Sequence, residues 1–272
     1  MVEGFWFTEE HTKNVSLSFR VKKVLFYKKS QYQEIVVLDT YEFGKMLVLD
    51  GAVMTTEKDE FIYHEMLVHP AMVVHPYPKD IIVIGGGDGG VAREILKYKE
   101  VKHIVMVEID KDVVETSKRF FPNLAKSFED KRLKLKFMDG FEFLKNSFEN
   151  FDIIFVDSPD PVGHAKILFS EEFYEEASKK TDILVAQMET PFYYNNFIKN
   201  TLQILKKHFE EVHLYFSPVP TYPSGWWSYV FCSHGVKPFD FIRTSPKDLK
   251  YYNFEIHKSS FALPNFLKEL LK

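Results

Sequence analysis

The sequence IVIGGGDGG, at residues 82–90, decides the fold. An apolar run ends in a turn that fits the pattern G-x-G-x-x-G, with Gly85, Gly87 and Gly90 in the glycine positions. A helical segment with the sequence VAREIL follows directly. A strand, a glycine-rich turn and a helix in this order are typical of the first unit of a Rossmann-like sheet. The turn therefore predicts an α/β fold with an open, mostly parallel sheet.

The rest of the chain after this turn continues the alternation of strands and helices. Helices are expected to start near residues 89, 112 and 140, and a long amphipathic helix covers 193–208. Strands are expected at 81–84, 103–108, 133–138, 152–156, 182–187, 212–216 and 227–232. This pattern predicts a methyltransferase-type, seven-stranded Rossmann-like sheet in residues 66–272. The last two strands form a hairpin, which implies one reversed strand at the edge of the sheet.

The chain before the turn has a different pattern. Strands with period-two alternation are expected at 15–21, 32–38 and 45–49, and the Asp50-Gly51 pair is a hairpin turn signal. Residues 1–65 therefore predict a small antiparallel β domain. A helix at 59–74 leads from this domain into the larger one, and it ends before Pro76.

Composition limits the classes of partner and compartment. The 272 residues carry a net charge of −4, and the lysines and arginines are spread along the chain, so nucleic acid is not expected as a partner. The one cysteine, Cys232, excludes an intramolecular disulfide and fits a reducing compartment. No apolar run approaches 18 residues, and the first residues lack the pattern of a signal peptide. We expect a cytoplasmic protein without a membrane segment.

Acidic residues follow four successive strands of the predicted sheet. Asp88, Glu108 and Asp139 each come at a strand end, and Asp157 and Asp160 follow the next strand. Ligands bind outside the carboxyl ends of the strands in such sheets, so these acids should point into one crevice. A crevice of this kind suits a polycation that carries a nucleoside.

Asp88 and Glu108 indicate which nucleoside. Glu108 follows Asp88 by 20 residues, at a strand end where a carboxylate can accept both hydroxyls of a ribose. Asp88 would repel a pyrophosphate or a carboxylate, since two like charges 4 Å apart cost about 4 kcal/mol at an effective dielectric of 20. An ammonium would be favoured instead. Decarboxylated S-adenosylmethionine meets both conditions, although Asp88 could also simply cap the next helix.

Asp157 is the candidate for proton transfer. A primary amine has a pKa of about 10.4 and must lose a proton before it attacks carbon, which a nearby carboxylate can accept. A sulfonium carbon is already activated, so neither a metal nor an oxyanion hole is needed. Asp160 could hold the cation in line, and Asp139 could bind an adenine amino group or cap a helix. By itself, the DSPDP segment at 157–161 could also be a plain turn.

These segments together resemble the spermidine synthase family, the polyamine aminopropyltransferases. The resemblance covers nearly the whole chain. The matching segments are YQ at 32–33, LVLDG at 47–51, TEKDEFIYHEM at 56–66, GGGDGG at 85–90, VEID at 107–110, DGF at 139–141, DSPDP at 157–161, PTYPSG at 220–225, YYNFEIHK at 251–258 and FALP at 261–264.

The resemblance implies transfer of an aminopropyl group from decarboxylated S-adenosylmethionine to putrescine, which gives spermidine and 5′-methylthioadenosine. Asp157 would be the general base, and decarboxylated S-adenosylmethionine would be a co-substrate with no metal or other cofactor. The nucleoside would be held by Gln33, Asp88, Glu108, Asp139, Gly140 and His164. The aminopropyl and diamine channel would be lined by Tyr63, His64, Asp88, Ser158, Asp160, Gln187 and Tyr222. The resemblance also implies a homodimer or homotetramer, a gate after Asp157, and closure of the channel's far end by Trp6 and Glu9.

Two residues depart from the family pattern. Pro159 stands where the family usually has Ser or Thr, and His164 stands where it usually has Pro. We hypothesise that His164, near acidic residues, adds a pH dependence between about 6 and 8. A rate profile of His164→Pro that overlays that of the parent would refute this, and an exposed loop histidine is the alternative.

Other interpretations stay open at this point. His64 could be structural, Tyr222 could be a rigid loop aromatic, and Trp226 and Trp227 are expected to pack within a strand. The acceptor could be cadaverine or agmatine instead of putrescine. A conventional methyltransferase would share the sheet but not Asp88, and a non-catalytic nucleoside-binding paralogue would keep the pocket without needing Asp157.

Overall fold

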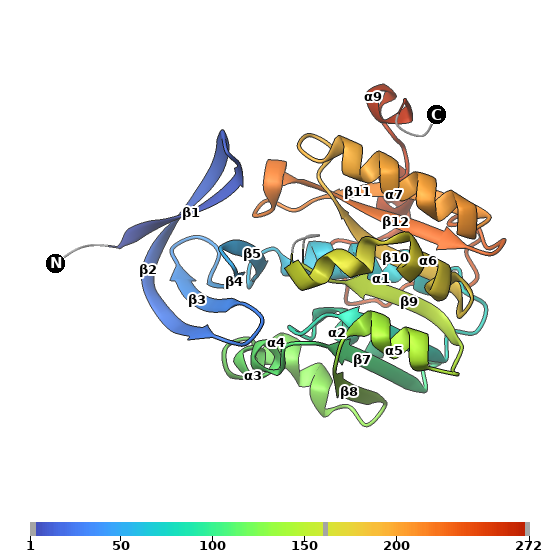
Figure 1. The fold of residues 1–272 in the computed structure, drawn as a ribbon, viewed down its shortest axis with the longest axis horizontal. Coiled ribbons are helices and arrows are strands. Elements are labelled where there is room, and N and C mark those ends of the chain that lie inside the picture. The colour runs from blue at the N-terminus through green and yellow to red at the C-terminus, as the bar shows by residue number, and fades with distance from the viewer. Residues whose placement is uncertain (1–3, 160–162, 270–272) are drawn as a thin grey trace.

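The computed structural model describes residues 4–159 and 163–269, which form two sheets (Figure 1). The five-stranded sheet is antiparallel, in the order β1-β2-β3-β4-β5. Its strands are β1 (Phe5–Thr12), β2 (Val15–Lys29), β3 (Glu34–Thr40), β4 (Lys45–Leu49) and β5 (Ala52–Thr56). The sequence predicted three of these strands and not β1 or β5. The Asp50-Gly51 turn joins β4 to β5 as expected.

The seven-stranded sheet has the order β11-β12-β10-β9-β6-β7-β8. Its strands are β6 (Asp80–Gly85), β7 (His103–Glu108), β8 (Leu133–Phe137), β9 (Phe151–Asp157), β10 (Thr181–Glu189), β11 (Glu211–Pro218) and β12 (Trp226–Ser233). The predicted α/β class and number of strands in this sheet are confirmed. Five of the strands, from β10 to β8 in this order, run parallel.

The position of the reversed strand was predicted wrongly. β12 is antiparallel to both β10 and β11, so it lies inside the sheet and β11 forms the edge. Burial explains this order. Seven of the eight residues of β12 are buried, whereas β11 begins with three half-buried residues, Glu211, Val212 and His213. The more apolar strand therefore takes the inner place, where both of its edges are paired.

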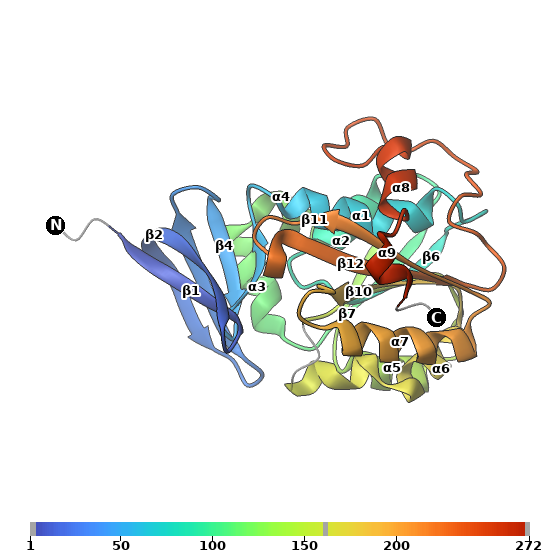
Figure 2. The ribbon, with the colours of Figure 1, turned by 90° about the horizontal axis from the view of Figure 1, so that it is seen from above.

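Helices cover both faces of the seven-stranded sheet (Figure 2). The first face carries α1 (Glu60–Met72), α2 (Gly90–Leu96) and α8 (Phe254–Ser260), whose side chains share one apolar core with β6, β7, β9 and β10. The second face carries α5 (Gly140–Asn146), α6 (Glu171–Ser178) and α7 (Asn195–His208), with a second core. The remaining helical segments are α3 (Lys111–Phe120), α4 (Pro122–Ala125), η1 (Lys126–Glu129), η2 (Gly163–Phe169), η3 (Pro223–Gly225) and α9 (Asn265–Lys268).

A third apolar cluster joins the small sheet to the large domain. Ile35 and Leu47 of the small sheet pack with Val113 of α3 and with Phe121 and Leu124 beside it. This contact places one face of the small sheet next to the carboxyl ends of β6 and β7. Within the two described ranges of the chain, none of the helices combines the length and apolar character that a membrane span requires.

Candidate active site

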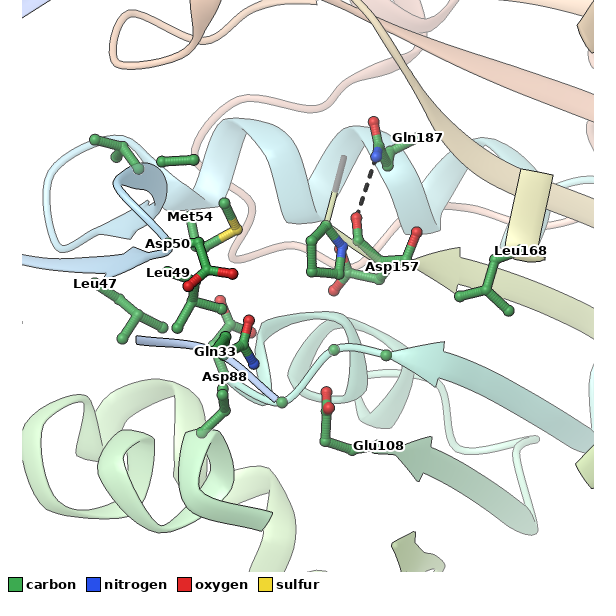
Figure 3. A pocket seen from close by; sticks show the side chains of 18 of the residues that line it. Gln33, Leu47, Leu49, Asp50, Met54, Asp88, Glu108, Asp157, Leu168 and Gln187 are labelled. Atoms are coloured by element: carbon green, nitrogen blue, oxygen red, sulfur yellow. Dashed lines mark hydrogen bonds between the residues drawn. The ribbon is translucent and has the colours of Figure 1, made fainter. Parts of the chain in front are cut away.

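A cavity of about 470 Å³ lies where the carboxyl ends of the parallel strands face the small sheet (Figure 3). Most of the residues expected in the site line this one cavity: Gln33, Tyr63, His64, Asp88, Glu108, Asp139, Gly140, Asp157, Ser158, Gln187 and Tyr222. Asp160 and the side chain of His164 lie outside the described residues. The fold thus gathers acids from four strand ends, which are far apart in the sequence, around a single space.

Asp157, at the end of β9, is held by its neighbours on two sides. Tyr63 of α1 donates a hydrogen bond from its hydroxyl to Asp157 Oδ1 at 2.6 Å. The backbone N–H of Gly86 donates to the Asp157 carbonyl at 2.9 Å. A side chain at Gly85 would place its Cβ 2.1 Å from that carbonyl oxygen, and Gly85 has φ +84°. Only glycine therefore lets the turn approach the end of β9 so closely.

The environment of Asp157 raises its proton affinity. Burial raises the pKa of this carboxyl to about 6, and the charge of Asp88 adds to the shift. The charge of His64 and the hydrogen bond from Tyr63 act in the opposite direction. At neutral pH the carboxylate is ionised, yet its pKa is close enough to ambient pH for it to exchange a proton with a ligand.

His64 forms a buried bridge between two acids. Its Nδ1 lies 2.6 Å from Glu60 Oε2, and its Nε2 lies 3.3 Å from Asp88 Oδ2. Burial alone would lower the pKa of His64, but the charges and hydrogen bonds of Asp88 and Glu60 raise it to about 10. The ring is therefore an imidazolium at neutral pH. A Cβ on Gly90 would lie 2.2 Å from this ring, so the ring can cover the start of α2 only because residue 90 is glycine.

The donor atoms of His64, Asp88 and Asp157 lie within 4.8 Å of one another, which is compact enough for a metal ion. A metal would have to displace the proton of His64, because an imidazolium has no nitrogen lone pair to donate. Two carboxylates beside a fixed cation match an ammonium group better.

Glu108 and Gln33 face the cavity from the side of the glycine turn (Figure 3). Burial raises the pKa of Glu108 to about 7, partly offset by the backbone N–H of Asp110, which donates to Glu108 Oε1 at 2.8 Å. The Gln33 amide nitrogen donates to Asp110 Oδ2 at 3.0 Å. An acid and an amide at this end of β7 can bind the hydroxyl groups of a sugar.

Of the two acids considered as helix caps, Asp139 has that role, whereas the N-cap of α2 is Gly89 and Asp88 only accepts a local backbone hydrogen bond beside it. Asp139 Oδ1 accepts a hydrogen bond from the Glu142 backbone N–H at 2.9 Å and caps α5. Asp88 Oδ1 accepts from the Gly90 backbone N–H at 2.8 Å. Both residues still line the cavity. Each carboxylate has two oxygens, so capping and ligand binding can coexist.

The other end of the cavity is aromatic. Tyr222 packs on Tyr63 with ring centroids 5.5 Å apart, and its hydroxyl donates to the Met54 carbonyl. Gln187 Nε2 donates to the Ser158 carbonyl at 3.1 Å (Figure 3). Among the described residues no partner is found for Gln187 Oε1, which is buried. This oxygen is thus available to accept a hydrogen bond from a ligand.

Sequence reasoning missed several lining residues. Trp227, expected to serve strand packing, lines the cavity, and within the described chain its buried Nε1 has no hydrogen-bond partner. Tyr32, Tyr194, Glu10 and Met54 also line it. No local pattern marks these residues, because they come from separate loops and strands that meet only in the fold. Glu9 lines the cavity as expected, whereas Trp6 is 65% exposed and is not among the described lining residues.

Fold and cavity together define an α/β protein with an acid-lined cavity at its strand ends. Comparison with protein families agrees with this description. Residues 60–241 match the spermine/spermidine synthase domain, and residues 5–57 match the spermidine synthase tetramerisation domain. The chain belongs to the spermine/spermidine synthase family of polyamine aminopropyltransferases.

Relatives and solved structures match over nearly the full length. The polyamine aminopropyltransferase of Alkaliphilus metalliredigens is 45% identical over 98% of both chains. That of Methanocaldococcus jannaschii is 44% identical, over 98% of this chain and 95% of the relative. A crystal structure of spermidine synthase in complex with the transition state analogue AdoDATO superposes with a TM-score of 0.95 at 39% identity, covering 98% of this chain and 94% of the other. The spermidine synthase of Thermotoga maritima gives a TM-score of 0.93 at 39% identity with the same coverage.

Proposed function

We propose that this aminopropyltransferase is a spermidine synthase that acts on putrescine and decarboxylated S-adenosylmethionine. The observation that carries the proposal is the gathering of Asp88, Glu108, Asp139 and Asp157 around one cavity, with the cation of His64 fixed among them. Such a site attracts ammonium and sulfonium groups and repels a carboxylate. The similarity to solved structures of spermidine synthases supports the same reaction.

The nucleoside would occupy the end of the cavity near the glycine turn. Glu108 and Gln33 would bind the ribose, Asp139 and Gly140 would lie beside the adenine, and Asp88 would pair with the ammonium of the aminopropyl chain. This arrangement would disfavour S-adenosylmethionine itself, because its extra carboxylate would meet Asp88.

Asp157 would act as the general base. The amine nitrogen of the acceptor attacks the carbon bonded to the sulfonium sulfur, and the carbon–sulfur bond breaks as the carbon–nitrogen bond forms. The electron pair of the broken bond stays on sulfur, which leaves neutral 5′-methylthioadenosine. The proton lost by the amine passes to Asp157, while the hydroxyl of Tyr63 keeps the carboxylate oriented through Oδ1. This chemistry needs no metal.

The acceptor would lie along the aromatic end of the cavity. Glu9 and Glu10, from β1, line its far part and can pair with the second ammonium of a diamine. Tyr63, Tyr222 and Trp227 would enclose the methylene chain between the two charged ends. Two charged ends with an apolar middle fit putrescine. Cadaverine and agmatine share this pattern and are the alternative acceptors.

The test is an assay of methylthioadenosine release from decarboxylated S-adenosylmethionine with putrescine, cadaverine, agmatine and spermidine as acceptors. We expect the highest kcat/KM with putrescine. Asp157→Asn should lower kcat by about 100- to 10,000-fold, the range typical of a lost general base, and leave methylthioadenosine binding intact.

Two outcomes would change the proposal. Preference for another amine would keep the reaction and change the acceptor. Tight methylthioadenosine binding without turnover of any amine, unaffected by Asp157→Asn, would instead identify a non-catalytic nucleoside-binding paralogue.

A further inference from the structure

Asp110 lies in the seam between the two domains, directly behind the nucleoside end of the cavity. It is 2% exposed, and it is not among the described residues that line the cavity. Its backbone N–H donates to Glu108 Oε1 at 2.8 Å. Its side chain accepts from Ser30 Oγ at 2.6 Å and from Gln33 Nε2 at 3.0 Å, both through Oδ2. One residue therefore contacts both candidate ribose-binding side chains, Glu108 and Gln33.

The contact with Asp110 determines which end of the Gln33 amide faces the ligand. A carboxylate can only accept hydrogen bonds, so the amide must turn its nitrogen toward Asp110. The amide oxygen then points the other way, and Gln33 lines the cavity. An oxygen in that place can accept a hydrogen bond from a ribose hydroxyl, whereas a flipped amide would offer a donor.

A second contact holds the backbone of this turn. Ser30 Oγ accepts hydrogen bonds from the N–H groups of Tyr32 at 3.0 Å and Gln33 at 3.1 Å. Its one hydroxyl proton has two acceptors within reach, the Gln33 carbonyl at 3.2 Å and Asp110 Oδ2 at 2.6 Å, and the shorter contact with the carboxylate is the stronger one. Asp110 thus holds the turn from β2 to β3 as well as the side chain that this turn presents.

Helix capping alone does not account for these contacts. Asp110 caps α3 through Oδ1, which accepts from the Asp112 N–H at 3.0 Å. A cap needs only this one oxygen. The contacts of Oδ2 reach residues 80 and 77 positions away in the sequence. The seam also has other supports, in the apolar cluster around Val113 and the Lys28–Asp112 ion pair at 2.7 Å.

We propose that Asp110 is a positioning residue for the nucleoside: its carboxylate fixes the Gln33 amide with the oxygen toward the ribose, while its backbone N–H orients Glu108. The inference rests on the proposed function, since it assigns the ligand of this end of the cavity. It predicts an effect on nucleoside affinity and not on the chemical step.

The test is calorimetric binding of 5′-methylthioadenosine to Asp110→Ser, Gln33→Ala and the double variant. Serine is a good helix cap and keeps the backbone N–H for Glu108, but it is too short to hold Gln33. We expect each single variant to bind about tenfold more weakly, the upper end of what one hydrogen bond between a ribose hydroxyl and a neutral amide contributes. The double variant should also lose about tenfold, because both changes remove the same interaction.

The control is Asp112→Asn, which breaks the neighbouring ion pair across the same seam without touching Gln33. Its affinity should equal that of the parent. In the assay, Asp110→Ser should raise KM for the nucleoside substrate and leave kcat within about twofold. Ser30→Ala, in a half-buried turn, gives a second variant should Asp110→Ser fail to fold, and a weaker affinity is expected for it.

Two outcomes would overturn this inference alone. The first is a loss of affinity in the double variant that equals the product of the two single losses. The second is parental affinity in Asp110→Ser or in a folded Ser30→Ala. Failure of the parent chain to bind the nucleoside would overturn the proposed function, and this inference with it.

Discussion

At the residue scale, opposing influences act on the proton affinity of Asp157. Since burial raises the pKa of its carboxyl to about 6, we expect kcat/KM to fall as the pH drops below about 6, where the base becomes protonated. His64→Gln removes the cation that opposes this shift. The acidic limb of the profile should therefore move to higher pH in that variant.

The measurement is a pH–rate profile of the parent, His64→Gln and His75→Gln. His75 pairs with Asp182 at the opposite ends of the strands, 3.2 Å away, so its variant serves as a control with the same substitution. If the acidic limb of the kcat/KM profile lies at the same pH in His64→Gln as in the parent, the imidazolium does not affect the pKa of Asp157.

Glu108 is a residue whose function opposes stability. Burial raises its pKa from 4.5 to about 7, so the folded state prefers the protonated acid. A carboxyl with a raised pKa stabilises the fold at low pH, and this contribution is lost as the pH rises from about 4.5 to about 7. Glu108→Gln should therefore stabilise the ligand-free protein by about 1 to 2 kcal/mol at pH 8, and by less at pH 5.

Urea unfolding of the parent and of Glu108→Gln at both pH values, without ligand, measures the difference. The same variant should bind methylthioadenosine more weakly. A stability difference that is equal at pH 5 and pH 8 would contradict the assigned shift.

At the scale of the element, helix α1 carries a half-buried glutamate, Glu60, and a buried one, Glu65, with different tasks. Glu60 pairs with His64, which lines the cavity, at 2.6 Å, and with Arg93 at 2.8 Å. Glu65 is 1% exposed and accepts hydrogen bonds from the backbone N–H groups of three residues in the C-terminal segment: Lys250, Tyr251 and Tyr252. The same helix therefore supports the site with one acid and the fold with the other.

The matched variants Glu60→Gln and Glu65→Gln separate these tasks. Glu60→Gln should lower the pKa of His64 from about 10, because it removes one of the two anions that hold the proton. Glu65→Gln should leave that pKa unchanged and lower the free energy of unfolding by about 2 kcal/mol, since the carboxylate accepts three buried hydrogen bonds. NMR titration of the His64 ring and urea unfolding report the two effects. The same His64 pKa in both variants would refute the division.

At the scale of the whole molecule, the small sheet exposes apolar side chains. Trp6 is 65% exposed, Val24 51% and Tyr27 59%, all on β1 and β2. Large exposed apolar side chains are candidates for an interface, and this sheet lies within the match to the tetramerisation domain. We expect light scattering to give a multiple of the 32.0 kDa chain mass.

Trp6→Asp combined with Val24→Asp should lower the mass in solution without loss of the fold. Phe148→Asp is the control, because Phe148 is fully exposed but lies outside the small sheet. An unchanged mass in the first variant would place the interface elsewhere.

Features that depend on neighbouring residues in the sequence were predicted correctly, whereas features that depend on distant contacts were not. The turn at residues 85–90, the acids at strand ends and the strand–helix alternation are local patterns, and the structure places them as predicted. β1 was missed because two adjacent acids, Glu9 and Glu10, obscure its alternation. The edge position of β11 was missed because strand order depends on which strand buries more apolar surface, which no local pattern states.

The sequence by itself determined the α/β class, the acidic character of the site and the family, because these rest on residue type, spacing and period along the chain. Only the tertiary structure decided that Trp227 faces the cavity, that His64 is held between Glu60 and Asp88, and that Asp110 reaches across the domain seam to Gln33. The physical reason is that protonation states and side-chain orientations depend on neighbours brought together by folding. Burial shifts the pKa of Asp157, His64 and Glu108 and strengthens the interactions between their charges, and these side chains are buried only in the folded protein.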